Sequence, residues 1–231
     1  MAVKAFLAAL LAPVLMIAVP PANVGSITVY GVQKELKTES IDYTGIYPQF
    51  NGIQDSKNQT LLNNQMREWQ NCAQARAKAA VLTLPNGDGP KRVVEAVYTY
   101  EVKRNSNGLI SLLFSDYLYA GGANGLDVKT GLTFSSVTGR MVTLPEFFES
   151  DASYQDVLNG MIGEQLKTRG LEAQLLASYT GLTGKETFYI TDSALVLVIR
   201  ELEWFPHAMG TVEFSIPFSD LQIYLKKGML I

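Results

Sequence analysis

The sequence is poor in the residues that build reactive and cross-linked sites. Its 231 residues include one cysteine, Cys72, and one histidine, His207. A single cysteine cannot form an internal disulfide or a multi-cysteine zinc site. Because Cys72 falls within a helical pattern, we expect it to be a small core residue. Gly-x-Ser-x-Gly, P-loop and dinucleotide-binding motifs are also missing, so none of these three chemistries is indicated.

The sequence also lacks the basic excess that a nucleic-acid partner requires. The formal net charge is −3 at pH 7, so we expect no nucleic-acid partner. Residues 57–104 carry eight Lys and Arg against four Asp and Glu, whereas residues 141–203 carry four against ten. The acidic segment is either an ordinary solvated face or a surface that steers a cationic partner, with Glu146, Glu149 and Asp151 as contact residues.

No apolar run is long enough for an ordinary membrane helix, which needs about 20 residues. Lys4 precedes an apolar run from Ala5 to Val19, and Pro20 and Pro21 follow it. A basic start, an apolar run of about 7–15 residues and a breaker are typical of an export signal. We therefore predict that residues 1–24 are a signal peptide or an N-terminal anchor and that the rest lies outside the cytoplasm. A buried helix of the mature fold is the alternative, and membrane contact is expected only through an uncleaved segment.

Hydrophobic residues make up 47% and charged residues 18% of the chain, which is enough apolar material for a core. Apolar residues recur at helical spacing from Ser56 to about Leu82, and Ser56 with Gln59 indicates a capping box. Pro48 and Asn51-Gly52 predict a loop over 47–52. Strands are predicted at 26–36, 40–47, 92–103, 109–119, 125–136, 186–190, 194–200 and 211–216, and further helices at 153–169, 171–179 and 219–227.

This order of elements predicts an α+β fold of antiparallel sheets with inserted helices, and argues against a parallel βαβ sheet. We expect two lobes, at residues 25–115 and 116–231. A glycine-rich connection, Tyr119–Gly125, joins two of the strands. Ordering three glycines costs conformational entropy, so we expect Gly121, Gly122 or Gly125 to have positive φ or to pack too closely for a Cβ.

One small group of residues could be catalytic or bind a metal ion. Glu201 and Glu203 alternate along an extended segment, and His207 follows them. Paired carboxylates can hydrolyse glycosides, and adding the histidine gives a metal-ligand set that falls short of an ordinary zinc site. Such pairs are also common on solvated strand faces. We therefore predict no catalytic residues, no metal and no cofactor, and keep these three residues as the alternative of an enzyme acting on cell-wall polymer.

The remaining motifs are informative as an ordered set. They are Tyr119–Gly125, Thr138–Leu144 before Phe147-Phe148, Phe188–Asp192 before a Val/Leu strand, Pro206–Gly210, and Val212–Pro217 with Leu221. The set resembles an extracytoplasmic bacterial module found in the lysozyme-sensing anti-sigma factor RsiV and ahead of the catalytic domain of PdaC-type peptidoglycan deacetylases. The upstream half, with Tyr47-Pro48 before a helix carrying Leu62-Asn63, looks like the companion domain of that module.

The resemblance implies an exported cell-envelope binding module. Its implied partner is a lysozyme-like protein or the peptidoglycan glycan. The binding residues that we expect are Gly121, Gly122 and Asn124 of the glycine-rich connection, together with the acidic residues named from the charge balance. Family members often carry His where this chain has Asn124, so a histidine-dependent role of that loop is not carried over. We expect a stand-alone module without the sigma-binding and deacetylase parts.

Overall fold

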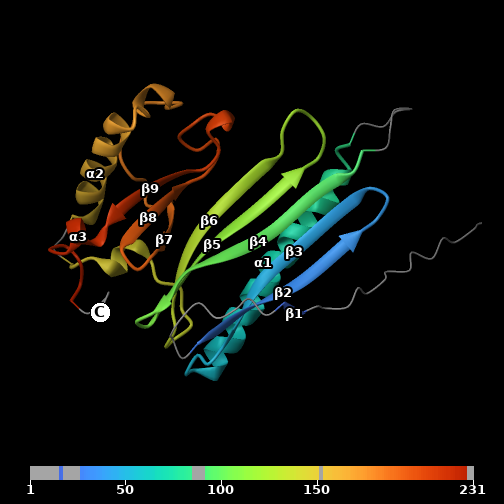
Figure 1. The fold of residues 1–231 in the computed structure, drawn as a ribbon, viewed down its shortest axis with the longest axis horizontal. Helices are drawn as coiled ribbons and strands as arrows, with labels where there is room; N and C mark the ends of the chain where they lie inside the picture. Colours follow the sequence, from blue (N-terminus) through green and yellow to red (C-terminus); the bar gives the residue numbers. More distant parts are fainter. Residues whose placement is uncertain (1–15, 18–26, 85–91, 151–152, 228–231) are drawn as a thin grey trace, which may run out of the picture.

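The computed structural model of the chain describes residues 16–17, 27–84, 92–150 and 153–227. Two sheets dominate the fold, with the order β1-β2-β3-β4-β5-β6 in the large sheet and β7-β8-β9 in the small one (Figure 1). The strands of the large sheet are β1 (Met16–Ile17), β2 (Thr28–Lys37), β3 (Ile41–Asn51), β4 (Val94–Ser106), β5 (Leu109–Tyr119) and β6 (Leu126–Ser135). The small sheet consists of β7 (Thr187–Ile190), β8 (Ala194–Ile199) and β9 (Val212–Pro217).

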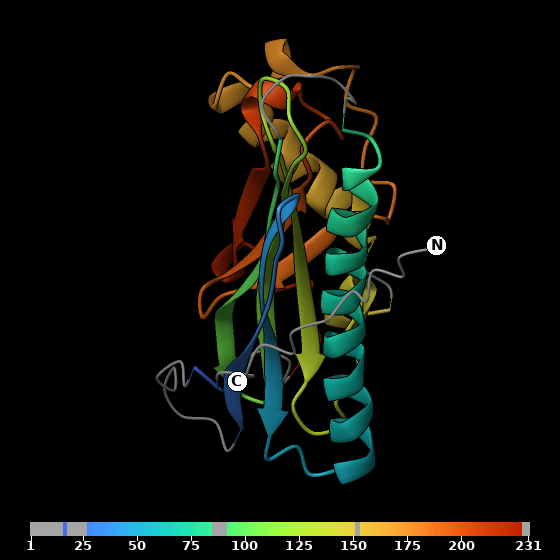
Figure 2. The ribbon, with the colours of Figure 1, turned by 90° about the vertical axis from the view of Figure 1, so that its right-hand side faces the viewer.

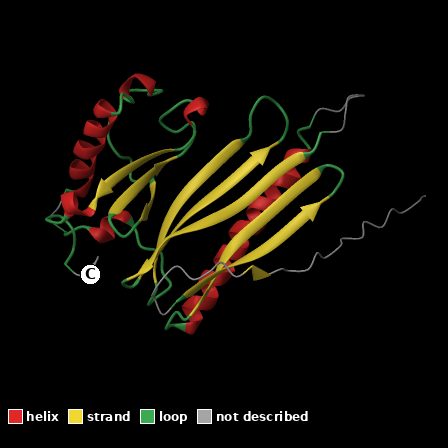
Figure 3. Cartoon of the chain, viewed as in Figure 1, coloured by secondary structure: helices red, strands yellow, loops and turns green. Residues whose placement is uncertain are grey.

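Helices cover the sheets as the predicted α+β class requires (Figure 3). They are α1 (Ser56–Val81), α2 (Tyr154–Thr168) and α3 (Phe218–Leu221), with 3-10 turns η1 (Leu144–Phe147), η2 (Glu172–Gln174) and η3 (His207–Met209). The helix predicted over 171–179 is only the short turn η2. Within the described parts of the chain, no helix is long and apolar enough to cross a membrane.

The large sheet contains one parallel pair of strands within the antiparallel arrangement that the sequence predicted. Ile41 to Gly45 of β3 pair in parallel with Val94 to Tyr98 of β4, while the other neighbouring strands pair antiparallel. The connection between β3 and β4 contains α1, which is the ordinary way to join two parallel neighbours. The α+β class is confirmed, and the expected antiparallel pairing holds for every neighbouring pair of strands described except this one.

The predicted long helix is confirmed as α1, with a different cap. Asp55 is the N-cap, and its Oδ1 accepts hydrogen bonds from the backbone N–H groups of Lys57 and Asn58, both at 3.0 Å. Gln59 instead accepts from the N–H groups of Gly52 and Ile53. Cys72 is exposed, so its assignment to the core was wrong. The buried stripe of α1 is Leu62, Met66, Gln70, Ala73, Gln74, Ala77 and Ala80.

Strand β3 continues through Pro48, where the sequence predicted a loop. Pro48 pairs with Gly31 of β2, and the pairing of β3 with β4 has already ended at Gly45. A proline lacks the N–H that a central strand needs, but it is tolerated where only one side of a strand is paired. The local sequence signal was therefore overridden by the position of the residue in the sheet.

The small sheet packs one face on α2 and turns its other face toward the large sheet. Leu158, Ile162 and Leu166 of α2 share a core with Leu195 and Leu197 of β8. Figure 2 shows α1 along one face of the large sheet, with strands of the small sheet beyond the opposite face. On that opposite side, a separate cluster joins Leu113 of the large sheet to Tyr189, Ala194, Val196 and Val198 of the small one.

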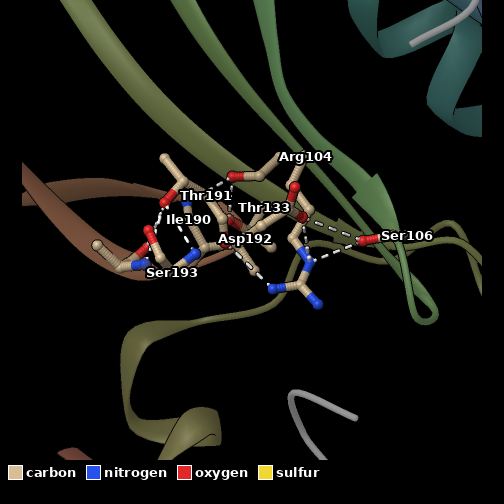
Figure 4. A network of polar contacts seen from close by, with 9 residues as sticks. Arg104, Ser106, Thr133, Ile190, Thr191, Asp192 and Ser193 are labelled. Carbon is tan, nitrogen blue, oxygen red and sulfur yellow. Dashed lines mark hydrogen bonds and ion pairs between the residues drawn. The ribbon is translucent and has the colours of Figure 1, made fainter. Parts of the chain in front are cut away.

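Two devices fix this junction. A Cβ on Gly131 of β6 would lie 2.5 Å from the backbone carbonyl carbon of Phe188, so only glycine allows β7 to approach this closely. Nearby, Arg104 donates to the carbonyl of Thr191 at 3.1 Å, and the backbone N–H of Ile190 donates to the Ser111 hydroxyl at 2.8 Å (Figure 4). The lobe boundary expected between residues 115 and 116 falls inside β5.

Candidate functional site

A groove of about 550 Å³ lies between α1 and the outer strands of the large sheet. Helix α1 packs chiefly on β3 and β4, so the groove follows its flank beside β5 and β6. We call it the α1 groove. It is lined by Trp69, Cys72 and Arg76 of α1, Tyr98, Phe114 and Asp116 of β4 and β5, Val128, Thr130 and Leu132 of β6, and Met141. Apolar and aromatic side chains form most of its surface, as is usual for a ligand site.

A second hollow of about 410 Å³, here called the junction hollow, continues the α1 groove toward the small sheet. Leu132 and Met141 line both cavities, and the junction hollow adds Pro145, Tyr154 and Phe188 among others. Met141 is 46% exposed at the point where the two meet. The α1 groove and the junction hollow together form one continuous apolar track. A large apolar side chain exposed to solvent on such a track indicates a surface that binds a partner or a ligand.

The charges of the α1 groove neutralise each other. The Arg76 guanidinium and the Asp116 carboxylate form an ion pair on its wall. Burial raises the pKa of Asp116, while the neighbouring Arg76 acts in the opposite direction. Because the two charged groups are paired with one another, the groove suits apolar or uncharged groups better than a free ion.

Glu186 organises the far end of the junction hollow. This residue is buried, and its carboxylate accepts hydrogen bonds from the N–H of Thr183 at 2.7 Å, the Thr183 hydroxyl at 2.9 Å and the N–H of Gly184 at 2.9 Å. A buried carboxylate with three donors holds its loop in one conformation. The wall of the hollow is thus built by the chain immediately before β7.

Comparison with known families divides the chain into two parts. Residues 34–127 match the family described as "Deacetylase PdaC", and residues 145–219 match "Protein of unknown function (DUF3298)". We call these two stretches the PdaC region and the DUF3298 region after the families that they match. The α1 groove lies chiefly in the PdaC region. The junction hollow is lined partly by the segment between the two regions, from Gly131 to Leu144, and partly by the DUF3298 region.

Solved structures show the same fold across both regions. A DUF3298 family member from Bacteroides fragilis superposes with a TM-score of 0.67 at 16% identity, covering 89% of this chain and 96% of its own. A DUF3298 family protein from Pseudomonas aeruginosa has a TM-score of 0.62 at 13% identity, covering 87% and 95%. No curated protein matches this chain.

The predicted glycine residues lie in the β5–β6 connection at the end of the PdaC region. Gly121 and Gly122 have φ of 89° and 106°, which confirms the prediction of positive φ. A Cβ on Gly125 would collide with the Tyr117 ring. Asn124 is exposed at this turn. The glycines thus shape a tight connection, and the lining of the two cavities does not include them.

The predicted acidic contact residues have different roles. Glu146 accepts hydrogen bonds from the N–H and hydroxyl of Thr143 at 2.7 and 2.8 Å and pairs with Arg140 at 2.6 Å. Glu149 is exposed and accepts from the N–H of Lys227 at 3.3 Å. Asp151 lies outside the described residues. Glu146 therefore caps η1, in addition to any part it plays in binding.

The alternative catalytic residues are only partly brought together. Glu201 pairs with His207 and also accepts a hydrogen bond from the N–H of Asp127 in β6 at 3.3 Å. Glu203 instead accepts from the N–H of Arg200 at 3.1 Å. Among the described residues, no group of three or more His, Cys, Asp and Glu could hold a metal ion. Glu201 thus ties the β8–β9 connection to the large sheet.

Sequence reasoning missed the residues that line the α1 groove. Trp69, Cys72 and Arg76 recur at spacings of three and four, so they share one flank of α1. Val128 and Thr130 alternate on one face of β6. Both patterns were visible in the sequence. What was not visible is that the helix flank and the strand face lie side by side.

Proposed function

We propose that this chain is an exported, non-catalytic binding module of the bacterial cell envelope, and that its partner is a lysozyme-like protein. The observation that carries the proposal is the continuous apolar track formed by the α1 groove and the junction hollow. Both family regions contribute to it, so the pair of regions acts as one binding surface. Export is supported by Lys4 and the apolar run that follows it.

A protein partner suits this track because its lining is apolar and its one ion pair is internally neutral. Partly exposed aromatic and methionine side chains are enriched where proteins meet, and a few of them carry most of the binding energy. Met141 and Trp69 are such side chains. Wall glycan is the second candidate, because a separate cavity lined by Lys129, Arg169 and Glu213 offers charged and hydrogen-bonding groups that a sugar could contact.

The test is surface-plasmon binding of the exported domain to a cationic lysozyme. A charge at the centre of an apolar contact is costly to bury, so Met141→Asp is expected to weaken binding by about tenfold or more. Val137→Asp is the matched control, because Val137 is 48% exposed against 46% for Met141 and does not line the track.

Equal affinities of the two variants would overturn the assignment of the track. No binding of the unaltered domain at low salt would remove lysozyme as the partner. The enzyme alternative has its own requirement, which is that Glu201, Glu203 and His207 converge on one substrate. In this structure Glu203 is bound to Arg200, while Glu201 is bound to His207.

A further inference from the structure

A polar hollow of about 670 Å³ lies on the other face of β6 from the α1 groove. Val128 and Thr130 line the α1 groove, and alternation along the strand turns Lys129 to the opposite side. The DUF3298 region supplies the remaining walls. We use the name polar hollow for the cavity lined by Lys129, Arg169, Tyr189, Thr211, Glu213 and Ser215.

Positive charge exceeds negative charge in the polar hollow. Lys129 and Arg169 face one carboxylate, Glu213, which accepts a hydrogen bond from the Tyr189 hydroxyl at 3.1 Å. Arg169 donates to the backbone carbonyl of Glu213 at 2.9 Å and lies over the Phe214 ring. Among the described residues, neither Lys129 nor Arg169 has a carboxylate partner within ion-pairing distance. The hollow can therefore accept one anionic group.

The wall of the polar hollow also contains hydroxyl groups. The Thr211 hydroxyl is buried and makes no hydrogen bond with the described protein. Buried polar groups are almost always satisfied, so such a group at a cavity wall is a candidate contact for a ligand. Ser215 is exposed on β9, and Val196 and Met209 supply apolar surface.

We propose that the polar hollow binds an acidic saccharide. The ligand carboxylate would lie between Lys129 and Arg169, because charge-assisted hydrogen bonds to a carboxylate are the strongest polar contacts available here. Sugar hydroxyls would pair with Thr211, Ser215 and Glu213, and the C–H face of the ring would pack on Val196 and Met209. The volume lies within the range of ordinary ligand sites. That the saccharide comes from the cell wall rests on the proposed function.

The experiment is calorimetric titration of the exported domain with three disaccharides that share N-acetylglucosamine. They differ in the second sugar. In the first disaccharide it is N-acetylmuramic acid, which carries a carboxylate, and in the second it is the neutral N-acetylglucosamine. In the third it is glucuronic acid, an acidic sugar from outside the wall. We expect the muramic acid disaccharide to bind about tenfold more tightly than the neutral one. Lys129→Ala is expected to remove that preference.

Two further variants make the result specific. Lys167→Ala removes an exposed lysine of α2 that does not line the hollow, and it should leave the affinity unchanged. Thr211→Val keeps the side-chain shape, and it should weaken binding of all bound disaccharides without lowering the melting temperature, because its hydroxyl has no protein partner.

The outcomes separate the site from the proposed function. The acidic-saccharide site would be overturned if none of the three disaccharides bound. It would also be overturned if the affinity depended neither on the charge of the sugar nor on the Lys129→Ala substitution. If the glucuronic acid disaccharide binds as tightly as the muramic acid disaccharide, the result would support a site for acidic saccharides. It would overturn the inference that the saccharide comes from the cell wall. If the unaltered domain and the Lys129→Ala variant both bind lysozyme with the same affinity, the proposed function stands whatever the sugars show.

Discussion

Glu146 shows how one carboxylate in the acidic segment supports the fold. Its side chain closes a capping box on Thr143 at the start of η1 and pairs with Arg140. The backbone N–H of Thr143, the Arg140 guanidinium and the Thr143 hydroxyl together lower the pKa of Glu146 to about 2. Neutralising Glu146, Glu149 and Asp151 together is therefore expected to affect stability as well as any electrostatic steering.

We predict that Glu146→Gln lowers the free energy of unfolding by about 1 kcal/mol at pH 7, because the neutral amide loses the ion pair with Arg140 and the charge that strengthens the hydrogen bonds from Thr143. The folded-state pKa lies below the ordinary value of 4.5, so this stabilisation is present above about pH 4.5 and is lost as the pH falls toward 2. Thermal melts at pH 7 and near pH 2 should show the difference shrinking at acid pH. Glu164→Gln on the exposed side of α2 is the control, and a difference independent of pH would contradict the account.

At the scale of elements, the sequence predicted the helices and turns whose conformation depends on contacts between residues near one another in the chain. The sequence predicted helix α1 and the positive φ of Gly121 and Gly122, because helix periodicity and the backbone of a glycine-rich turn depend on near neighbours. The sequence did not predict that β3 continues through Pro48 or that β3 and β4 pair in parallel. Both depend on which strand lies on each side, and that is settled by the packing of α1.

The approach of β7 to β6 gives a test at this scale. Gly131→Ala would place a methyl group against the Phe188 backbone, which cannot move aside as a flexible side chain can. We expect a loss of about 1–3 kcal/mol in the free energy of unfolding, as for other overpacked sites. Chemical denaturation is the measurement.

Gly160→Ala is the matched control for that experiment. Gly160 lies within α2, and apart from its chain neighbours and the nearby backbone of the helix itself, no atom would come within 4 Å of its added Cβ. Alanine is the better helix former there, so a gain of up to about 1 kcal/mol is expected. An unchanged stability for Gly131→Ala would mean that the two strands are farther apart than described.

At the scale of the whole molecule, the two family regions form one unit. The Arg104 network and the Leu113 cluster join the sheets, and Glu201 ties the β8–β9 connection to β6. The sequence indicated the resemblance and the order of the strands. It could not indicate the α1 groove, the junction hollow or the polar hollow, because each is lined by residues that folding brings together from distant positions.

The central claim is that a protein partner binds across both regions at once. Hydrogen–deuterium exchange of the protein without residues 1–24, with and without a cationic lysozyme, tests it most directly. The account predicts that lysozyme slows exchange in the second half of α1, in β6 and in residues 141–145. Residues 184–186, which lie at the edge of the junction hollow just before β7, should be protected less strongly. Protection confined to one region, or protection only on surfaces away from the α1 groove and junction hollow, would contradict it.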